Sequence, residues 1–370
     1  MSVVIEADWA VSLIFFGDHM YKWNAYGDNS LWNLRASDNP VTQADFTLNS
    51  LDASTLNLSL AKYGITIVIK GSFTFPATSP TVAQVNGTAL NSTVSLGDVL
   101  LEREIWGNGA DFQSLFNFDY TLGLLAGDDY FEGSSTVANS DNAQGLGGND
   151  RFKGYGDENN SGDYFFGGEG TDTSIYRGKL SEYVVSPDSA IWDGRLGDGT
   201  RVSGYSVEDQ TADRDGKDYL NEVERLQFSD KSLALDVGAT QNAGKAKLFT
   251  GAIAHSLAND AATLGTILHF IDNGYSDLTS LSKLAIDVGL ISNLAGGSSN
   301  EALAGLVTAN LLGEANAIVE GMLLGYMNGT IASYSQAQFL GAVAALEVNQ
   351  QRVDLTGLAE TGMEYIPLGL

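Results

Sequence analysis

The period with which apolar and polar residues alternate changes along this 370-residue chain. Residues 62–75 are rich in β-branched and aromatic side chains with partial alternation, which predicts a strand. Residues 96–105 have the spacing of a short helix. Taken together, these patterns predict an independent, mostly β domain over residues 1–118.

From about residue 242 to the end, the apolar positions follow a helical period instead. Breaks at Asn273-Gly274, Gly296-Gly297, Gly313 and Asn328-Gly329 divide this stretch into about five or six short helices. Its alanine and glycine content predicts close packing, so we expect an all-α bundle over residues 238–370. The positions with helical spacing are Leu281, Leu284, Ala285, Val288, Phe339, Val343 and Leu346.

Between these two regions the composition shifts sharply to glycine, aspartate and asparagine. Three segments, residues 124–131, 145–152 and 167–174, fit the nonapeptide Gly-Gly-x-Gly-x-Asp-x-apolar-x of calcium-binding β-helix repeats. Two degenerate copies are centred on Asp141 and Asp163. The pattern predicts a parallel β-roll over residues 119–178, although a plain glycine-rich linker remains an alternative interpretation.

The spacing of the aspartates supports the roll independently. Asp129, Asp141, Asp150, Asp163 and Asp172 follow one another at intervals of 12, 9, 13 and 9 residues. This is a nine-residue period with small insertions. Because two nonapeptides make one turn of a flattened coil, we expect the first, third and fifth aspartates along one edge and the other two along the opposite edge.

These residue types suit calcium, which takes about six to eight oxygen ligands. Glycine permits positive φ and close backbone approach, so that carbonyl oxygens can face an ion. Aspartate adds a carboxylate, and the apolar residue two positions later begins an inward-facing strand. The predicted metal ligands and turn residues are Gly127, Asp129, Asp141, Gly148, Asp150, Asp163, Gly168, Gly170 and Asp172.

We expect about two ions along the first edge and about one or none along the second. Without metal the stacked carboxylates repel one another, so the segment should be disordered. Ser174 and Ala143 stand where the repeat has a large apolar residue, which should thin the roll. So few repeats need flanking domains as caps.

A second acidic cluster follows the repeats. Residues 211–222 loosely resemble a calcium loop, with Gly216 at its sharp turn. Thr211 replaces the first ligand of such a loop, so a solvated acidic loop is the competing interpretation. The weaker metal candidates here are Asp213, Asp215, Asp218 and Glu222.

Together, the repeats resemble those of the RTX (repeats-in-toxin) family, which bacteria export by type I secretion. The likeness covers residues 120–237, because residues 215–230 resemble the β segment that follows such rolls. We therefore expect a β extension over residues 179–237 that caps the roll. The tail resembles a helical domain of unknown function often found behind RTX rolls, in residues 349–353 and 362–365.

The resemblance implies calcium-driven folding outside the cell and an uncleaved C-terminal export signal. The apolar stretch at residues 11–16 is too short for the hydrophobic core of a signal peptide. No run approaches the length of a membrane span, so no transmembrane insertion is expected. The expected location is extracellular, at the cell surface, reached by the type I route.

The charge and the cysteine content limit both the partners that the chain can bind and the bonds that can stabilise it. The chain has 19 Lys and Arg against 46 Asp and Glu, a net charge of −27. Such a surface repels nucleic acid and attracts divalent cations. The chain has no cysteine, which excludes disulfides and thiolate metal sites. Without disulfides, bound metal is the usual means of stabilising the fold of an extracellular protein.

Sequence motifs for catalysis are missing. Three histidines are present, and none lies in the HExxH motif of zinc proteases. Residues 204–208 approach the GxSxG motif of lipases but lack its last glycine. We predict no catalytic residues and no enzyme. Acidic residues that keep glycoside hydrolysis open are Asp18, Asp28, Asp38 and Asp45.

The sequence thus predicts a secreted calcium-binding structural or adhesive protein of the cell surface or matrix, such as a surface-layer, filament or biofilm component. We expect it to form homo-oligomers or a surface assembly on calcium, and to meet cell-surface polysaccharide. One alternative is a carbohydrate-binding module or glycan-active enzyme, and another is a secreted hydrolase. The aromatic residues that suggest sugar binding are Tyr21, Trp23, Tyr26 and Trp32.

Overall fold

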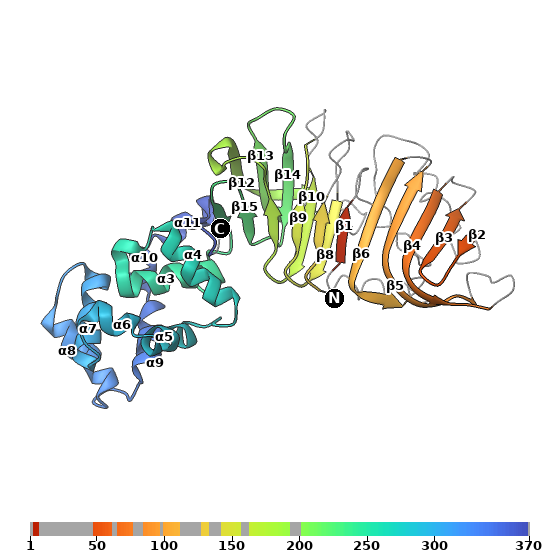
Figure 1. Ribbon diagram of the computed structural model, residues 1–370. Coiled ribbons are helices and arrows are strands. Elements are labelled where there is room, and N and C mark those ends of the chain that lie inside the picture. The colour runs from red at the N-terminus through yellow and green to blue at the C-terminus, as the bar shows by residue number, and fades with distance from the viewer. Residues whose placement is uncertain are drawn as a thin grey trace. The chain divides into compact units, whose positions relative to one another are not determined.

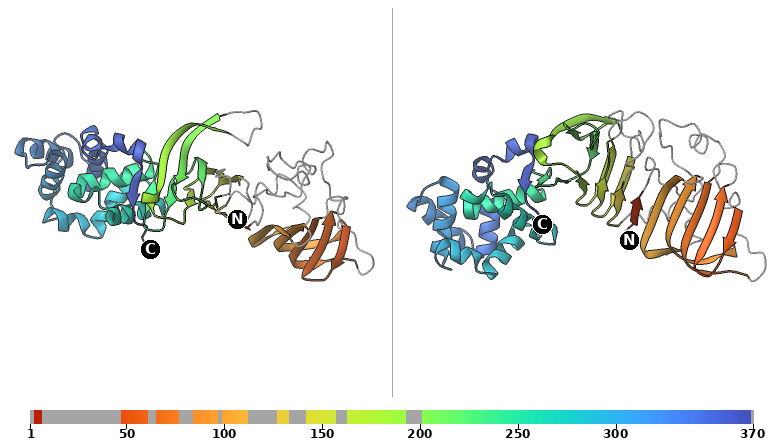
Figure 2. Two further views of the ribbon diagram at one scale, coloured as in Figure 1. Left: turned by 90° about the horizontal axis from the view of Figure 1, so that it is seen from above. Right: turned by 45° about the horizontal axis from the view of Figure 1, so that its top comes forward.

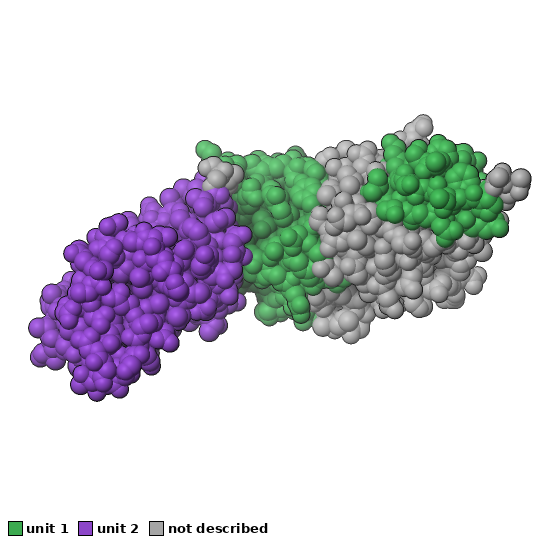
Figure 3. Space-filling view, turned by 60° about the horizontal axis from the view of Figure 1, so that its bottom comes forward, with its two compact units in different colours: residues 1–229 green, residues 230–370 purple. Residues whose placement is uncertain are grey.

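The computed structural model divides the chain into two compact units, residues 1–229 and 230–370 (Figure 3). Strands dominate the first unit and helices dominate the second (Figure 1), so the predicted combination of β and α regions is confirmed. The structure describes residues 3–6, 47–60, 65–76, 84–96, 99–111, 127–132, 142–156, 163–192 and 201–368.

An antiparallel meander begins the first unit (Figure 2). Alternate residues of its strands point into a core, as in the pairs Leu56 with Ile69 and Leu58 with Ile67, which are all buried. The strand predicted over residues 62–75 is confirmed. The strands are β2 (Thr47–Leu51), β3 (Thr55–Leu60), β4 (Ile65–Thr74), β5 (Asn86–Leu96) and β6 (Val99–Asp111).

The short helix predicted over residues 96–105 is wrong. β5 ends at Leu96, and residues from Val99 onward form β6. β6 pairs antiparallel with β5 on one side and with β1 (Val3–Glu6) on the other. Backbone partners at both edges outweigh the local helical spacing, since strand preference depends strongly on tertiary context.

Parallel strands follow in two mixed sheets, and successive strands along the chain alternate between these sheets (Figure 1). The first parallel strand, β7, pairs with β1, so one of the two sheets also contains the meander. The parallel parts of the two sheets are called the parallel sheets below. Because neighbouring strands run in the same direction, the turns at each edge stack on one another. One sheet contains β7 (Tyr130–Glu132), β9 (Arg151–Lys153), β11 (Thr173–Ile175) and β15 (Arg225–Gln227). The other contains β8 (Asn142–Gly147), β10 (Tyr164–Glu169) and β14 (Lys217–Asn221).

A long hairpin interrupts this alternation between β11 and β14. A single 3-10 turn, Leu180–Glu182, leads into β12 (Tyr183–Trp192), which pairs antiparallel with β13 (Arg201–Asp209). β13 then pairs with β14, and Figure 2 shows the hairpin in yellow-green. The predicted β extension therefore has two parts, the hairpin and the returning strands β14 and β15, which continue the parallel sheets.

Aromatic side chains fill the space between the two parallel sheets. Phe131, Phe152 and Phe165 are fully buried. The ring of Phe165 stacks on that of Phe152 at 5.1 Å between centroids and lies 6.3 Å from that of Phe131. The two small residues singled out above, Ala143 and Ser174, are buried as well.

Nine α-helices form the second unit between residues 242 and 361, where about five or six were predicted. The extra ones have only six or seven residues, too short for a periodic pattern to show. The helices are α3 (Asn242–Ala254), α4 (Ala261–Asp272), α5 (Leu278–Asp287), α6 (Leu290–Ala295), α7 (Asn300–Leu312), α8 (Ala317–Met327), α9 (Gln336–Ala344), α10 (Glu347–Arg352) and α11 (Leu355–Thr361). Two short strands, β16 (Ser232–Ala234) and β17 (Met363–Tyr365), pair antiparallel.

Local sequence explains where these helices begin and end. Asp260 and Asp277 accept hydrogen bonds from the first backbone N–H groups of α4 and α5, as N-cap residues do. Gly296 and Gly313 end α6 and α7 in the left-handed conformation, with φ of 71° and 84°. The predicted glycine breaks at these positions are confirmed.

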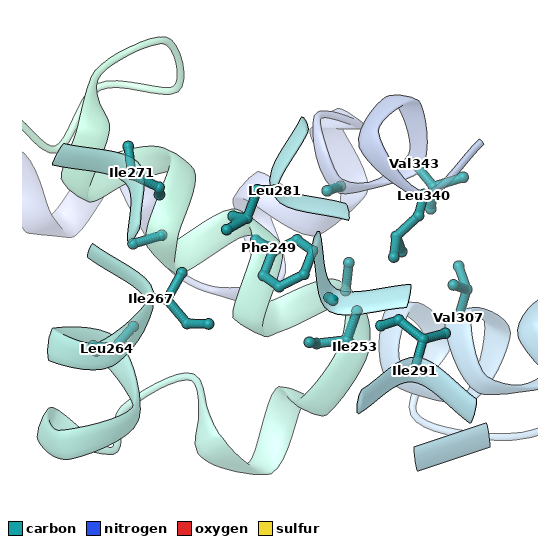
Figure 4. Close-up of a cluster of buried hydrophobic side chains, with 14 of the residues drawn as sticks. Phe249, Ile253, Leu264, Ile267, Ile271, Leu281, Ile291, Val307, Leu340 and Val343 are labelled. Carbon is teal, nitrogen blue, oxygen red and sulfur yellow. The ribbon is translucent and has the colours of Figure 1, made fainter. Parts of the chain in front are cut away.

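Helix α3 lies at the centre of the second unit's hydrophobic core, and ten of its 13 residues are buried. Figure 4 shows Phe249 of this helix among side chains from several other helices, including Leu281 of α5 and Ile267 of α4. Phe249 has no exposed surface. The bundle therefore packs around one buried helix.

Replacing Phe249 with alanine should lower the free energy of unfolding of the helical unit by about 3–5 kcal/mol, because it leaves a cavity in this core. Denaturation of the full chain, followed by helical circular dichroism, measures the change. The matched control is Ile318→Ala, since Ile318 is 78% exposed and its loss should change stability by at most about 0.5 kcal/mol. Equal effects of the two substitutions would contradict the central position of Phe249.

Candidate metal centre

Three of the predicted aspartates form a continuous row across the stacked turns. The backbone N–H of Asp129 donates to Oδ1 of Asp150 over 2.8 Å, and that of Asp150 donates to Oδ1 of Asp172 over 2.8 Å. Each aspartate directly precedes a strand of the same parallel sheet, so strand register aligns them. The structure thus brings together the three residues that the sequence places on one edge.

The same turns are joined by further hydrogen bonds. The N–H of Arg151 donates to the carbonyl oxygen of Asp129, and that of Thr173 donates to the carbonyl oxygen of Asp150, both over 2.8 Å. On the outer side, the N–H of Asn149 donates to Oδ1 of Asp128 over 2.7 Å. Every turn is therefore bonded to the next through backbone and side chain.

Burial makes this row electrostatically costly. Asp150 and Asp172 have no exposed surface, and their Oδ2 atoms have no hydrogen-bond partner among the described residues. Burial raises the pKa of both carboxyl groups to about 7, against the opposing effect of the backbone N–H that each accepts. The negative charge of Asp150 adds to the rise in the pKa of Asp172.

Glycine makes room for each of these buried carboxylate oxygens. A β-carbon on Gly145 would lie 1.9 Å from Oδ2 of Asp150 and 2.5 Å from the carbonyl oxygen of Gly167. A β-carbon on Gly167 would lie 2.4 Å from Oδ2 of Asp172 and 2.1 Å from the carbonyl oxygen of Glu222. In both turns, a carboxylate oxygen and a carbonyl oxygen of the next turn meet over a glycine, and any side chain there would fill the space.

The predicted turn glycines occupy the stacking positions. Gly148 and Gly170 have φ of 117° and 146°, which other residues rarely adopt. A β-carbon on Gly148 would lie 2.3 Å from the carbonyl oxygen of Gly127, and one on Gly170 would lie 1.7 Å from that of Gly148. Gly168, with φ of 100°, approaches the carbonyl oxygen of Leu146 in the same way. Successive turns therefore place a carbonyl oxygen of one turn directly against a glycine of the next.

Glu224 continues the row, and the sequence-based prediction missed it. The N–H of Asp172 donates to Oε2 of Glu224 over 2.9 Å. Glu224 directly precedes β15, as Asp172 precedes β11. An acidic residue followed two positions later by a buried apolar residue, Leu226, is the signal that could have identified it.

The opposite edge carries a second, shorter row. The N–H of Asp163 donates to Oδ1 of Asp218 over 3.0 Å, and the N–H of Tyr219 donates to the carbonyl oxygen of Asp163 over 2.7 Å. Both aspartates are buried. Asp141, predicted for the same edge, lies outside the described residues.

The four weaker metal candidates do not form one loop. Asp215 accepts from Nε of Arg177 over 2.6 Å and from the Tyr183 hydroxyl, while Asp218 stacks on Asp163. Asp213 and Glu222 are exposed at left-handed positions. Asp218 lies in strand β14 and Asp215 pairs with Arg177, so the four residues do not surround a single ion.

Among the described residues, no three acidic, histidine or cysteine side chains converge as a metal-binding group. Residues 204–208 lie within strand β13, not at the strand-to-helix turn of a nucleophile elbow. His255 and His269 lie on helical segments of the second unit. The N-terminal aromatic and acidic residues named above, together with His19, lie outside the described part of the chain.

Comparison of the chain with protein-family models, with curated proteins and with solved structures finds no match. In the ranges that the structure describes, no helix combines the length and the apolar character needed to cross a bilayer.

In the absence of metal, the parallel sheets should lose stability as the pH rises from about 4 to 7. The pKa of Asp150 and that of Asp172 are about 7 in the folded chain, whereas the pKa of an aspartate in the unfolded chain is about 4. The folded chain then binds protons more tightly, so its free energy of unfolding is highest below this window and falls through it. Urea unfolding with a chelator present, followed by near-ultraviolet circular dichroism, measures this slope.

The double variant Asp150→Asn/Asp172→Asn is the control, since neither amide titrates. Its free energy of unfolding should vary less with pH over the same range. A wild-type protein whose metal-free stability rises between pH 4 and 7 would contradict the burial of these two carboxyl groups.

Proposed function

We propose that residues 119–178, together with β14 and β15, form a calcium-binding β-roll of the RTX type, and that the protein is secreted. The observation that carries this proposal is the repeated meeting of a buried aspartate oxygen and a carbonyl oxygen of the next turn over a glycine. Calcium takes such mixed sets of carboxylate and backbone oxygens, so it does not need three acidic side chains in one place.

The carboxylates of Asp129, Asp150 and Asp172 would hold the ions, with carbonyl groups of the glycine turns. Each ion would supply the positive charge that the buried row needs. A buried charge that loses its partner lowers the stability of the fold, and buried carboxylates that stack without a cation do the same. The raised pKa values of Asp150 and Asp172 express this cost in the metal-free chain.

The first edge has room for about two ions, one between each pair of stacked glycine turns. The turn before β15 has three residues like the turns before β9 and β11, but it has Glu222 and Glu224 in place of glycine and aspartate. Oε2 of Glu224 accepts a hydrogen bond from the backbone N–H of Asp172. We therefore regard β14 and β15 as the protein cap that ends the row.

For the whole chain we propose a structural or adhesive role at the cell surface or in the extracellular matrix, without enzymatic activity. The net charge of −27 supports a surface whose self-repulsion calcium would screen. Calcium could then join copies into an assembly or link the chain to acidic polysaccharide. Export by the type I route belongs to the same proposal.

Calcium titration by isothermal calorimetry tests the site. The wild type should bind at least two ions. Asp150 lies in the middle of the row, so Asp150→Asn should abolish the binding of the ions on both of its sides or lower their affinity at least tenfold. Asp287→Asn is the matched control, because Asp287 is exposed and pairs with Lys283 in the helical unit. A wild-type protein that binds no calcium at millimolar concentration would overturn the proposed function.

Light scattering with calcium and with a chelator tests the assembly. We expect the molar mass to rise with calcium and to return to its starting value when the chelator is added. A calcium-bound protein with the mass of one chain would leave the calcium site in place and remove the assembly role. Sugar-dependent quenching of tryptophan fluorescence without assembly would favour the carbohydrate-binding alternative.

A further inference from the structure

Helix α8 is apolar on nearly all sides, yet most of it is exposed. Among its 11 residues, Ala317–Met327, the one charged residue is Glu320, and the buried ones are Gly325 and Met327. Figure 1 shows α8 on the outside of the helical unit, next to α7. A helix that is apolar all round is normally buried, so the exposed side of α8 indicates a surface that another molecule covers.

Four residues of α8 at the spacing i, i+3, i+4 and i+7 lie along this exposed side. They are Ile318, Gly321, Met322 and Gly325. Ile318 and Met322 are 78% and 60% exposed. A β-carbon on Gly321 would meet no described atom within 4 Å, so the backbone is accessible there. Glu320 lies about half a turn away from Ile318, on the other side of the helix.

The loop after α8 extends the same side. The N–H of Ile331 donates to the carbonyl oxygen of Gly325 over 2.8 Å, and a β-carbon on Gly325 would lie 2.8 Å from Cδ1 of Ile331. Ile331 therefore lies over this glycine, and it is 54% exposed. The ring of Tyr334, 43% exposed, stacks on that of Tyr326 at 6.1 Å between centroids. We call Ile318, Gly321, Met322, Ile331 and Tyr334 the α8 face.

The surroundings of the α8 face are poor in charge. Residues 288–346 contain three glutamates (Glu301, Glu314 and Glu320) and no aspartate, lysine, arginine or histidine, whereas the whole chain has a net charge of −27. Most of the protein surface therefore repels a second copy and attracts basic partners. The α8 face does neither. It is complementary to an uncharged apolar surface, and a second α8 face is such a surface.

The exposed apolar area suits a small dimer interface. Large apolar side chains present roughly 150–250 Å² when fully exposed, so the exposed fractions of the four large side chains correspond to about 350–550 Å². A stable interface buries about 800 Å² on each partner, and a little more than half of this area is apolar. One α8 face on each copy therefore supplies the apolar part of an interface of this kind.

We propose that two copies of this chain form a symmetric dimer through the α8 face. A two-fold axis brings the same residues of both copies together, so one self-complementary surface is sufficient. Gly321 allows the two helices to approach closely, with Met322 of each copy near the axis. This contact needs no calcium ion, and it therefore goes beyond the calcium-driven assembly proposed above.

Sedimentation of the full chain in the presence of a chelator tests the dimer. We expect a dissociation constant on the order of 10–100 µM, because interfaces of this size are weak. The affinity should rise with salt, since salt screens the repulsion between two chains of charge −27 and weakens no attraction at an uncharged face. A wild type that stays monomeric well above this concentration range would overturn the proposal. At the lower concentrations used for circular dichroism the chain is monomeric, so Ile318→Ala remains a valid control for Phe249→Ala.

Charged substitutions test which surface makes the contact. Met322→Glu places two carboxylates close together across the axis, so it should lower the dimer affinity about tenfold or more. Val348→Glu is the matched control, because it adds the same charge at an exposed position of another helix, α10. An equal mixture of Met322→Glu and Met322→Lys should form dimers again, since opposite charges then meet. Equal losses of affinity in Met322→Glu and Val348→Glu, or a mixture that stays monomeric, would contradict a two-fold contact at the α8 face.

Flotation with phosphatidylcholine vesicles distinguishes a lipid surface from a second copy. Helices that bind membrane surfaces are rich in lysine and arginine, and α8 has neither, so we expect no binding of the wild type. Vesicle binding that Met322→Glu abolishes, without self-association in solution, would assign the α8 face to lipid and overturn the dimer. Calcium calorimetry of Met322→Glu should match the wild type, so failure of the dimer and failure of the calcium site are distinguishable.

Methionine methyl NMR keeps the test valid if the charged variants do not fold. Met322 lies on the α8 face, whereas Met327 and Met363 are buried. With ¹³C-methyl methionine in the wild type, the Met322 signal, assigned with Met322→Leu, should shift or broaden as the protein is concentrated. The signals of Met327 and Met363 should stay unchanged. A Met322 signal that is unchanged at concentrations where the chain is dimeric would place the contact elsewhere and contradict the proposal.

Discussion

The central part of this protein depends on holding carboxylates next to one another inside the fold. Asp150 and Asp172 each accept, through Oδ1, a hydrogen bond from a backbone N–H of the preceding turn, and so fix the register of strands only three residues long. The second oxygens of Asp150 and Asp172 are buried without a hydrogen bond from the described residues. The same residues therefore align the sheets and oppose their formation, and a shared cation would resolve this conflict.

The rest of the first unit manages the ends of this row. In the turn before β15, Glu224 takes the place of the aspartate. Its carboxylate accepts a hydrogen bond from the backbone N–H of Asp172, the last aspartate of the row. On the other edge, Arg177 and Arg214 hold the turn closed through Asp215 and Asp209. Short parallel strands bury little surface alone, so the aromatic cluster of Phe131, Phe152 and Phe165 between the sheets and these capping contacts are needed together.

Local patterns predicted the glycine turns, the row of three aspartates and the glycine breaks of the helical unit, because each depends on nearby residues. They missed the partners that fold back across the hairpin. Asp172 bonds to Glu224 over 52 positions and Asp163 to Asp218 over 55, so no nine-residue period connects them. The strand β6 was mistaken for a helix for the same reason, since its two partner strands decide its conformation.

An X-ray structure from crystals grown in millimolar calcium tests the central claim most directly, with data collected where calcium scatters anomalously. The account predicts anomalous peaks between successive turns of the first edge, in contact with Oδ2 of Asp150 and of Asp172. Well-ordered turns with no anomalous peak beside either carboxylate would contradict it, because the buried row would then be stable without a cation.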